Sequence, residues 1–459
     1  MYRVAFFLFL TIVSMNSAVA RNGFFSNREC AKIKLYLEFL KNNIPCQKIS
    51  DRILENSEIQ NCTKKVWDLW VEVNAAEKNN PFANLRPLEK SDTVSWLIPE
   101  SLEPHAWMTS YVGTKGDVVG GRWPMFLYLH GSGPKEQEWG TGLRLCQQFD
   151  DAPSVYFIPR IPNEGEFYRW WQQGKQCVWE RLLRLAMTSG KIDPNRLYVL
   201  GISEGGYGSQ RLASYYADYW AAAGPMAGGE PLINAPVENC SNIGFSLLTG
   251  SKDNGFYRNR LTTYVHEAFD SLKHVYEGRF IHRIKLIPGA GHGINYSPTT
   301  PWLKKFVRNP YPKFFIWENF EMDGKYRDGF YNLQVVERSD TSKGSRTRYM
   351  MKIEHNTIRI SVDLVTYQTI EQDSIWGISL RFNKTYHEAT SGKFILYLSD
   401  NLVDLEKPIR VFVNEKVVYN GKVKANLYSL INSCVLFSDP FRLYPVSVDV
   451  DIEKLYKNT

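Results

Sequence analysis

The chain has 459 residues, with 44% hydrophobic residues, 22% charged residues and a formal net charge of +7 at pH 7. These proportions are ordinary for a soluble globular protein. The positive charge is small for this length, and lysine and arginine form no continuous block, so we expect no nucleic-acid partner. The length exceeds what one hydrophobic core usually serves, so two domains are the default expectation.

The first residues are typical of a secretory signal peptide. Arg3 gives a short positive start, an apolar run follows over 4–13, and Ala18-Val19-Ala20 has the small residues that a signal peptidase needs. The run is about half of the roughly 20 residues that span a bilayer, which favours cleavage over a membrane anchor. We therefore expect a signal peptide over 1–20, cleaved near Ala20, and a secreted or periplasmic mature protein with no stable membrane span.

The sequence contains seven cysteines, an odd number, whose spacing matches no zinc-binding pattern. Because an exported protein of this size has a large core, we expect at most one or two disulfide bridges. We also expect no metal and no cofactor.

Residues 21–92 are predicted to be a helical N-terminal segment. Apolar residues recur at helical spacing in 31–44, and a second amphipathic stretch covers 64–79. We interpret this segment as a helical cap or packing layer.

From residue 93 onward, short apolar runs alternate with longer amphipathic stretches. Two opening strands are predicted within 93–113. Further strands are predicted at 125–129, 154–158, 196–200, 245–249 and 282–287, and helices at Gln176–Ser189, Glu204–Asp218 and Arg258–Lys273. This alternation predicts an α/β domain over 93–310, with a mostly parallel sheet flanked by helices and a ligand site at the carboxyl ends of its strands.

Two prolines interrupt the helical pattern within 308–318, and strand-like runs with two-residue alternation follow. We expect an all-β, sandwich-like accessory domain over 311–459.

The strongest local signal is Gly201-Ile202-Ser203-Glu204-Gly205, which lies between a predicted strand and a predicted helix. A serine at such a sharp turn projects its hydroxyl above the sheet edge, and glycines on both sides prevent clashes. Ser203 is therefore the candidate nucleophile. The backbone N–H of Glu204, at the start of the helix, is a candidate oxyanion donor.

A second glycine turn, His130-Gly131-Ser132-Gly133-Pro134, directly follows the strand at 125–129. The backbone N–H of Gly131 or Ser132 is the second candidate oxyanion donor, although an ordinary strand-ending turn has the same pattern. We interpret His130 as a residue that shapes the loop.

A nucleophilic serine needs a base, and the base needs an orienting acid. His292 lies in a glycine-rich loop after the last strand of the α/β region, where a catalytic histidine belongs. The other candidates downstream of Ser203, His266, His274 and His282, fall in or near a helix or at a strand start. We expect each of them to be structural or exposed.

Asp253 follows the strand at 245–249 and lies between Ser203 and His292 in the chain, which makes it the candidate acid. Glu230 is the rival, because it is expected at the same sheet edge, and it is also a candidate to touch substrate. Asp218 and Asp270 fall in or at the end of helices, where we expect solvated carboxylates.

The segment before the predicted helix at 176–189 contains Arg169, Trp170 and Trp171. Exposed aromatic rings beside an arginine stack on sugar or aryl groups and hold a carboxylate or hydroxyl, so these three residues are candidates for substrate binding. The alternative is that the aromatic rings pin a long loop to the core.

Four motifs give residues 93–310 a resemblance to secreted bacterial α/β-hydrolases, the depolymerase-like or prolyl-oligopeptidase-like serine esterases. The motifs are the HGSGP turn (130–134), the GISEGG turn (201–206), the GSKDNGF loop (250–256) and the GAGHG loop (289–293). The C-terminal β region resembles the accessory domain of some of these hydrolases, to which no activity is attached.

The resemblance implies an α/β-hydrolase fold, a Ser203–His292–Asp253 triad and no metal. It does not define the leaving group, because esterases and peptidases share this scaffold. We expect hydrolysis of carboxylic esters through an acyl-enzyme, with a glycan-derived substrate that carries acetyl, methyl or feruloyl esters. The alternatives are an exopeptidase, with Glu230 or Arg169 anchoring a peptide terminus, and a non-catalytic glycan-binding protein on a hydrolase scaffold.

Overall fold

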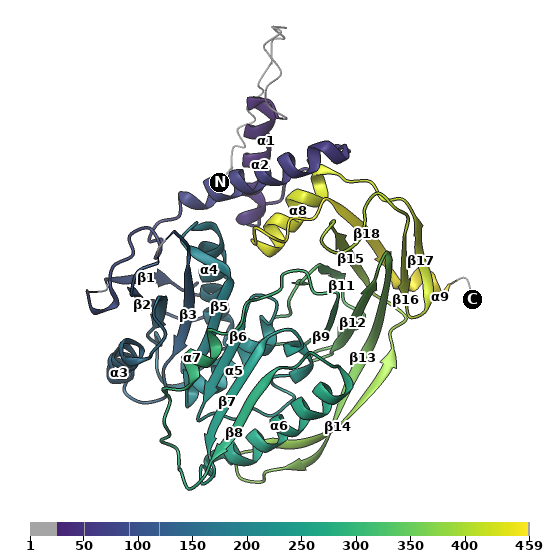
Figure 1. Ribbon diagram of the computed structural model, residues 1–459. Helices are drawn as coiled ribbons and strands as arrows, with labels where there is room; N and C mark the ends of the chain where they lie inside the picture. Colours follow the sequence, from purple (N-terminus) through teal and green to yellow (C-terminus); the bar gives the residue numbers. More distant parts are fainter. Residues whose placement is uncertain (1–24, 50, 91, 119, 458–459) are drawn as a thin grey trace, which may run out of the picture.

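The computed structural model describes residues 25–457 except 50, 91 and 119 (Figure 1). It consists of two N-terminal helices, an eight-stranded sheet flanked by helices, and a C-terminal region with two further sheets. The predicted signal peptide lies outside the described residues.

The N-terminal helices are α1 (Asn27–Lys41) and α2 (Asn56–Ala75), as the apolar spacing predicts. Ser26 and Glu29 form a reciprocal capping box at the start of α1. Both helices contact α8 (Leu427–Phe437) of the C-terminal region, and α2 also contacts α4 (Gln173–Thr188), so they cover the junction between the two larger regions (Figure 1).

The central sheet has the strand order β1-β2-β4-β3-β5-β6-β7-β8. The bounds are β1 Thr93–Leu97, β2 Trp107–Lys115, β3 Trp123–Leu129, β4 Ser154–Pro159, β5 Ile192–Ile202, β6 Ala222–Met226, β7 Gly244–Gly250 and β8 His282–Ile287. Only β2 runs antiparallel to its neighbours, and β3 to β8 are parallel. This order and direction of strands are those of the α/β-hydrolase fold.

Helices cover both faces of this sheet, because alternate side chains of its buried strands point to opposite faces. Phe126 and Tyr198 face a core shared with α3 (Lys135–Gln148) and α7 (Thr299–Leu303). Leu127 and Val199 face the opposite core, which they share with α4, α5 and α6. The bounds of the last two helices are Glu204–Tyr215 for α5 and Arg258–Val275 for α6.

The C-terminal region contains two sheets, of order β10-β11-β15-β18 and β17-β16-β13-β12-β9, with β14 paired to β13. Side chains from both sheets meet in one core, where Trp317 stacks on Phe330 with ring centroids 5.2 Å apart. The bounds are β9 Phe314–Asn319, β10 Gly329–Phe330, β11 Leu333–Glu337, β12 Thr347–Glu354, β13 Thr357–Gln372, β14 Ser379–Glu388, β15 Lys393–Leu398, β16 Ile409–Val413, β17 Lys416–Gly421 and β18 Val446–Asp451.

The prediction of an all-β region is wrong in one respect, because the region also contains α8 and a short α9 (Ile452–Tyr456). The side chain of Asn426 caps α8 by accepting from the N–H of Ser429. The buried side of α8 packs against α1, α2 and β18.

A buried ionic network joins the α/β region to the C-terminal region. Asp218 accepts hydrogen bonds from Arg327 and Arg442, and Asp439 accepts from Arg308 and Arg442. The side chains of Asp218, Asp439, Arg308 and Arg442 are 0% exposed. The expectation that Asp218 is solvated is therefore wrong, since its carboxylate is enclosed by guanidinium groups from other parts of the chain.

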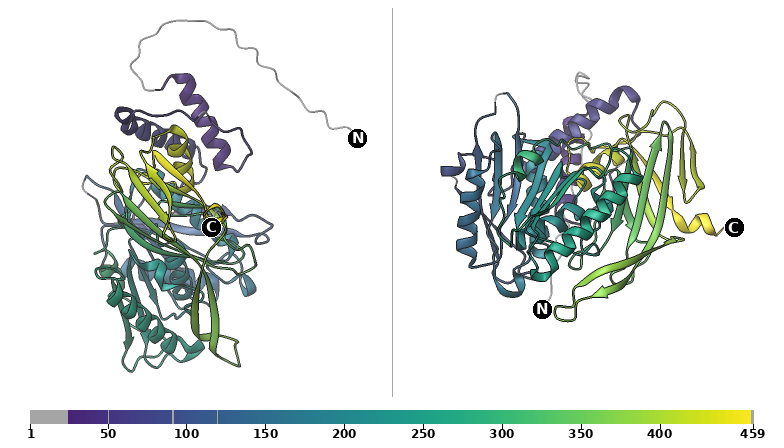
Figure 2. Two further views of the ribbon diagram at one scale, coloured as in Figure 1. Left: turned by 90° about the vertical axis from the view of Figure 1, so that its right-hand side faces the viewer. Right: turned by 60° about the horizontal axis from the view of Figure 1, so that its bottom comes forward.

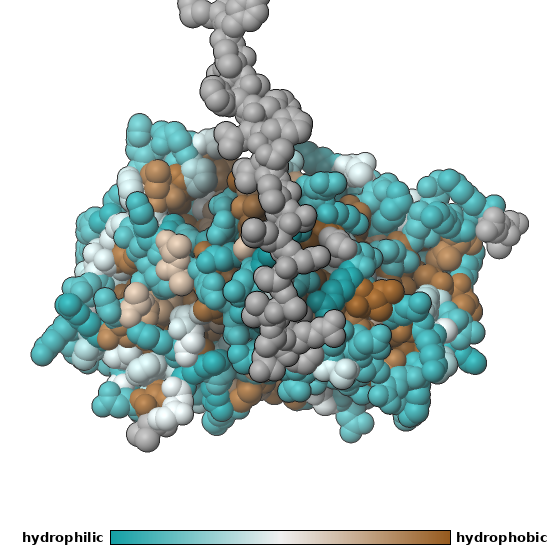
Figure 3. Space-filling model, turned by 90° about the horizontal axis from the view of Figure 1, so that it is seen from above, coloured by the Kyte–Doolittle hydropathy of each residue, from teal (hydrophilic) through white to brown (hydrophobic). Residues whose placement is uncertain are grey.

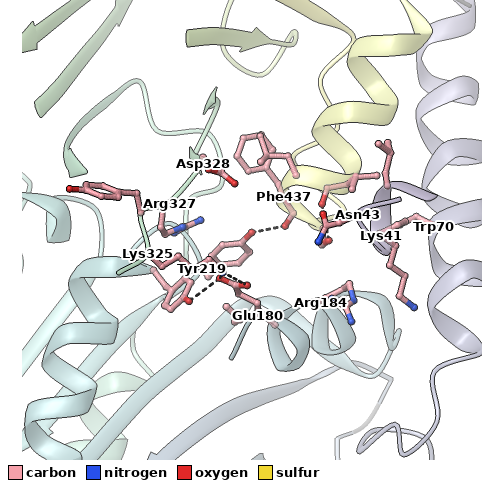
Figure 4. A pocket seen from close by; sticks show the side chains of 18 residues that line it. Lys41, Asn43, Trp70, Glu180, Arg184, Tyr219, Lys325, Arg327, Asp328 and Phe437 are labelled. Carbon is pink, nitrogen blue, oxygen red and sulfur yellow. Dashed lines mark hydrogen bonds and ion pairs between the residues drawn. The ribbon is translucent and has the colours of Figure 1, made fainter. Parts of the chain in front are cut away.

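A cavity of 290 Å³ lies near this network, where α2, α4, α8 and the segment 325–329 meet (Figure 4). On its wall, the hydroxyl of Tyr219 donates to the carbonyl of Phe437 at 2.7 Å, and Lys325 contacts Glu180 at 2.6 Å. These polar contacts cross the junction between the regions.

Seen from above, hydrophilic residues dominate the described surface, with smaller hydrophobic patches among them (Figure 3). Within the described ranges, no helix has the length and apolar character of a membrane span. All seven cysteines lie in these ranges and are free thiols there.

Candidate active site

Ser203 lies at the turn between β5 and α5 with φ 57° and ψ −113°. A non-glycine residue with positive φ is strained and persists only where its surroundings hold it. Here the N–H of Ser203 donates to the carbonyl of Met226 at 3.0 Å, and the carbonyl of Ser203 accepts from the N–H of Tyr207 at 3.0 Å. The strained turn thus holds the serine at the carboxyl edge of the sheet.

The two glycines of the turn are required by close backbone contacts. A Cβ on Gly205 would lie 1.9 Å from the carbonyl oxygen of Leu129, and a Cβ on Gly201 would lie 2.2 Å from that of Gly205. No side chain fits at either position, so the turn can approach the end of β3 only with glycine on both sides.

Ser203, His292 and Asp253 form a hydrogen-bonded series. The Nε2 atom of His292 is 3.0 Å from the Oγ of Ser203, and its Nδ1 atom is 2.8 Å from the Oδ2 of Asp253. With Nδ1–H donating to the carboxylate, Nε2 has the free lone pair that accepts the serine proton. The three candidate residues from the sequence are therefore together in the arrangement of a nucleophile, a base and an orienting acid.

Two loops that contact one another carry the acid and the base. The N–H of Lys252 donates to the carbonyl of Ala290 at 2.9 Å, and the N–H of Gly289 donates to the Oγ of Ser251 at 2.9 Å. A Cβ on Gly250 would lie 1.9 Å from the carbonyl oxygen of Gly291. This close contact fixes the separation between Asp253 and His292.

Arg258, the first residue of α6, holds the other side of the Asp253 carboxylate. Its Nε and Nη2 atoms donate to the two carboxylate oxygens at 2.7 to 2.9 Å. Burial opposes ionisation of Asp253, but the hydrogen bonds from Arg258 and His292 outweigh it and lower the pKa of the carboxyl. Arg258 was not among the residues predicted from the sequence, where its only signal is an arginine at a helix start five residues after the candidate acid.

The candidate oxyanion donors border Ser203. Glu204 is the first residue of α5, so its backbone N–H has no acceptor within the helix. A Cβ on Gly131 would lie 3.4 Å from the Cβ of Ser203, which places the turn after β3 directly beside the candidate nucleophile. Ser132, the next residue of this turn, is exposed.

His130 is fully buried beneath this turn, where its Nε2 accepts from the N–H of Ile161 at 3.1 Å. Burial lowers the pKa of His130 to about 4, so the ring is neutral at pH 7. Trp170 lies against it and donates from Nε1 to the carbonyl of His130 at 3.0 Å. The suggestion that Trp170 binds substrate is wrong, because its ring is 0% exposed and pins the loop to the core.

Beside Ser203, a pocket of 540 Å³ is lined by three of the other candidates, Arg169, Trp171 and Glu230, and by the side chain of Glu204. Both oxygens of Glu230 are held by Arg211, at 2.7 and 3.2 Å, and Asn234 donates to one of them at 2.8 Å. Asp253, and not Glu230, is thus the carboxylate that contacts His292.

Glu204 is 8% exposed, and its carboxylate lies 3.6 Å from the Nη1 of Arg169. Burial raises the pKa of this carboxyl to about 7, although the charge of Arg169 acts in the opposite direction. Glu204, the residue after the candidate nucleophile, therefore lines the pocket with a carboxyl group whose pKa is raised.

Two of the other candidate histidines, His266 and His282, contact a carboxylate other than Asp253. His266 and His282 both contact Asp270, at 3.4 and 3.1 Å, on the outer side of α6 and β8. Asp270 is exposed, as expected for a carboxylate on the surface of a helix.

Comparison of the sequence with protein-family models and with curated proteins gives no match. Among solved structures, a thermostable esterase aligns at 18% identity with a TM-score of 0.37, over 48% of this chain and 64% of the esterase. A ferulic acid esterase from Anaeromyces mucronatus aligns at 14% identity and TM-score 0.35, over 47% of this chain and 90% of its own.

A poly(3-hydroxybutyrate) depolymerase from Bordetella parapertussis also aligns at 14% identity and TM-score 0.35, over 48% of this chain and 90% of the depolymerase. Each alignment covers about half of this chain. At sequence identities this low, the similarity to these proteins is a similarity of fold alone. By the strand order and direction of its eight-stranded sheet, the chain contains an α/β-hydrolase fold.

Proposed function

We propose that the chain is a serine hydrolase that cleaves carboxylic esters. The observation that carries this proposal is the hydrogen-bonded series from Ser203 through His292 to Asp253, at 3.0 and 2.8 Å, beside a pocket of 540 Å³. A serine hydroxyl is a weak nucleophile, and a neutral imidazole oriented by a buried carboxylate activates it.

The reaction runs in two halves. Nε2 of His292 takes the proton from Ser203 as Oγ bonds to the ester carbonyl carbon, and the N–H groups of Glu204 and of the Gly131–Ser132 turn bind the oxyanion. The carbon–oxygen bond to the alcohol then breaks, and His292 gives its proton to the leaving oxygen. Water, deprotonated by His292, next attacks the acyl-enzyme, and the acid product leaves as Ser203 regains its proton.

We propose a glycan-linked acyl or methyl ester as the substrate. The side chain of His292 is 44% exposed, so the reacting atoms are accessible to a bulky molecule. The adjoining pocket combines aromatic rings such as Trp171 with carboxylates, the two kinds of group that proteins direct at sugar rings and hydroxyls.

Export is part of this proposal, since residues 1–20 have the three segments of a signal peptide. Expression of the full chain in a secreting host, followed by N-terminal sequencing of the extracellular or periplasmic protein, checks it. A mature N-terminus close to Arg21 supports export, and an intracellular protein that retains residues 1–20 contradicts it.

The activity is tested by assaying the wild type, Ser203→Ala and the matched control Ser297→Ala, whose serine is exposed beyond the histidine loop. The substrates are p-nitrophenyl acetate, acetylated, methylated and feruloylated glycans, and aminoacyl-p-nitroanilides. We expect ester turnover that falls about 10⁴-fold or more in Ser203→Ala and is retained in Ser297→Ala.

Turnover of the anilides alone would identify an exopeptidase instead. Saturable glycan binding without any turnover would identify a binding protein on a hydrolase scaffold. Ester turnover that persists in Ser203→Ala would exclude Ser203 as the nucleophile.

A further inference from the structure

The hairpin of β13 and β14 reaches from the C-terminal region to the candidate active site. β12 pairs with β13 as far as Leu364, whereas β14 continues the pairing to Gln372. The outer half of the hairpin therefore projects beyond the sheet and runs beside α6 (Figures 1 and 2). Its tip, residues 373–378, ends near the loop that carries Asp253.

Side chains of that loop and of α6 hold the hairpin. The hydroxyl of Tyr257 donates to Asp373 at 2.7 Å, and Arg260 contacts Glu371 at 2.6 Å. The ring of Phe256 lies 5.0 Å from that of Trp376. These contacts join the hairpin to the segment that directly follows the candidate acid.

Phe256 and Tyr257 both have positive φ, at 48° and 60°. Two consecutive non-glycine residues in this region are strained, and such strain persists only where surrounding contacts maintain it. Here the left-handed backbone turns both rings toward the hairpin, so the loop geometry and the hairpin contact depend on one another.

The pocket beside Ser203 lies between the hairpin and α5. Glu204, Tyr207 and Arg211 line it from the α5 side, and residues 376–379 of the hairpin line it from the opposite side. Trp376 is 62% exposed and presents a broad apolar surface there. One wall of the pocket is thus polar and belongs to the nucleophile helix, and the other is aromatic and belongs to the C-terminal region.

An unsatisfied acceptor lies on the polar wall. The Oε1 atom of Glu204 is buried and has no hydrogen bond among the described residues, and its contact with the Nη1 of Arg169, at 3.6 Å, is an ion pair beyond hydrogen-bond distance. The oxygens of Glu230 on the same wall are, in contrast, occupied by Arg211 and Asn234. A buried carboxylate oxygen without a donor is costly, and a donor from a bound ligand relieves that cost. Because Glu204 follows the nucleophile, such a ligand group lies close to the reacting ester.

The residues on the two walls of the pocket indicate which class of ligand fits it. Glu204 requires a hydrogen-bond donor, and Trp376 favours the flat, apolar face of a ring. Glu230 is already paired with Arg211, and the Glu204 carboxylate lies 3.6 Å from Arg169. Neither carboxylate is therefore free to pair with the ammonium group of a peptide N-terminus. A sugar ring combines hydroxyl donors at its edge with an apolar face.

We propose that this pocket is a sugar subsite, completed by the β13–β14 hairpin, in which Glu204 accepts hydrogen bonds from ring hydroxyls and Trp376 stacks on the ring. The inference rests on the proposed ester hydrolase activity, and it assigns the C-terminal region a direct part in substrate recognition. Glu204 and Trp376 then determine specificity, while Ser203, His292 and Asp253 carry out the chemistry.

The test measures kcat/KM for an acetylated xylo-oligosaccharide, for p-nitrophenyl acetate, which lacks the sugar, and for methyl ferulate. The variants are Trp376→Ala, Glu204→Gln and the control Ile375→Ala; Ile375 is 77% exposed on the same hairpin tip. We expect the ratio of the sugar ester to p-nitrophenyl acetate to fall about tenfold or more in the first two variants. In the control it stays within about twofold of the wild-type ratio.

An unchanged ratio in both variants, or an equal fall in Ile375→Ala, overturns the proposal. A fall confined to methyl ferulate also overturns it, because the pocket would then bind the aromatic acyl group. Thermal unfolding of each variant shows whether the loss arises from misfolding.

A second measurement separates this proposal from the hydrolase activity. Titration of deacetylated xylo-oligosaccharide into Ser203→Ala, followed by tryptophan fluorescence, reports binding without turnover. Saturable binding that Trp376→Ala weakens about tenfold supports the subsite even if no ester is hydrolysed, in which case only the proposed function fails. Ser203-dependent ester turnover with no detectable sugar binding overturns the subsite alone.

Discussion

Arg258 donates hydrogen bonds to both carboxylate oxygens of Asp253, at 2.7 to 2.9 Å, while one of those oxygens also contacts His292. Asp253 is 3% exposed, so the guanidinium takes the place of solvent around the carboxylate. The ion pair keeps the acid charged and fixes the plane of its oxygens. Arg258 is in this sense a positioning residue that acts on His292 through Asp253.

Replacing Arg258 with methionine is expected to lower kcat for p-nitrophenyl acetate about tenfold, with a smaller change in KM. Without the guanidinium, only His292 still opposes the effect of burial on the pKa of Asp253, so the carboxyl protonates at a higher pH. The acidic limb of the kcat profile should therefore move to higher pH. Steady-state kinetics from about pH 4 to 8 measures both effects.

Arg258→Lys keeps the charge and should restore part of the wild-type profile, which loss of packing alone would not do. In the wild type the lowered pKa of Asp253 adds stability above the ordinary value of 3.8, and this stability is lost as the pH falls through the lower, folded-state pKa. Superimposable pH profiles for the wild type and Arg258→Met would show that Arg258 does not position the acid.

Glu204 should make the free energy of unfolding depend on pH in the direction opposite to that expected from Asp253. Its pKa is raised from 4.5 to about 7, so the folded state binds the proton more tightly than the unfolded state. The stability contribution is complete below pH 4.5 and is lost as the pH rises through about 7, a loss on the order of 3 kcal/mol. Urea unfolding between pH 4.5 and 8 should show this decline in the wild type and not in Glu204→Gln.

The exposed Glu277 provides the matched control, because Glu277→Gln should retain the decline. A Glu204→Gln variant whose stability follows the wild-type pH dependence would show that this carboxyl titrates normally in the folded protein.

The close backbone contact at Gly205 predicts that Gly205→Ala prevents folding or lowers the free energy of unfolding by about 4 kcal/mol or more, since the new Cβ meets a main-chain oxygen at 1.9 Å. Gly140→Ala is the control, because the nearest atom to its Cβ is a flexible arginine nitrogen at 3.8 Å in α3. A helical glycine replaced by alanine should stabilise the protein by about 0.5–1 kcal/mol. Equal unfolding midpoints for the two variants would contradict the steric account.

The sheet and the proximity of Ser203, His292 and Asp253 were predictable because each depends on local signals. A serine between glycines at a strand end adopts a sharp turn, and Asp253 and His292 follow later strands whose carboxyl ends reach the same edge. In a parallel sheet, chain order and strand ends together bring such residues close, with no need to know the packing of distant segments.

The features that the sequence did not reveal depend on packing between distant residues. The sequence left Trp170 open between substrate binding and pinning its loop, and only its packing against His130 shows that the ring is buried. Asp218 lies just after α5 and is enclosed by arginines more than 100 positions later in the chain. The position of Trp376 beside the pocket depends on a hairpin that crosses from another sheet. Neither periodicity nor a short motif encodes contacts of this range.

The network around Asp218 should be a major source of stability at the junction of the two regions. Asp218→Asn leaves the buried guanidinium groups of Arg327 and Arg442 with too little negative charge, and breaking a buried ion pair in this way costs about 3–5 kcal/mol. The half-buried Asp404 pairs at the surface with the exposed Lys407, so Asp404→Asn should cost at most about 1 kcal/mol. Urea unfolding at pH 7 compares the two variants.

The same network predicts the result of a double substitution. In Asp218→Leu combined with Arg442→Met, both charges are removed together, so the loss should be smaller than the sum of the two single losses. Additive losses would mean that the two side chains stabilise the protein independently.

Burial opposes the ionisation of Asp218 and Asp439, but the surrounding arginines lower the pKa of both. The stability that these two carboxylates contribute therefore persists through mildly acidic pH and is lost only below the ordinary aspartate pKa. Asp253, whose pKa is also lowered, remains ionised over the same pH range.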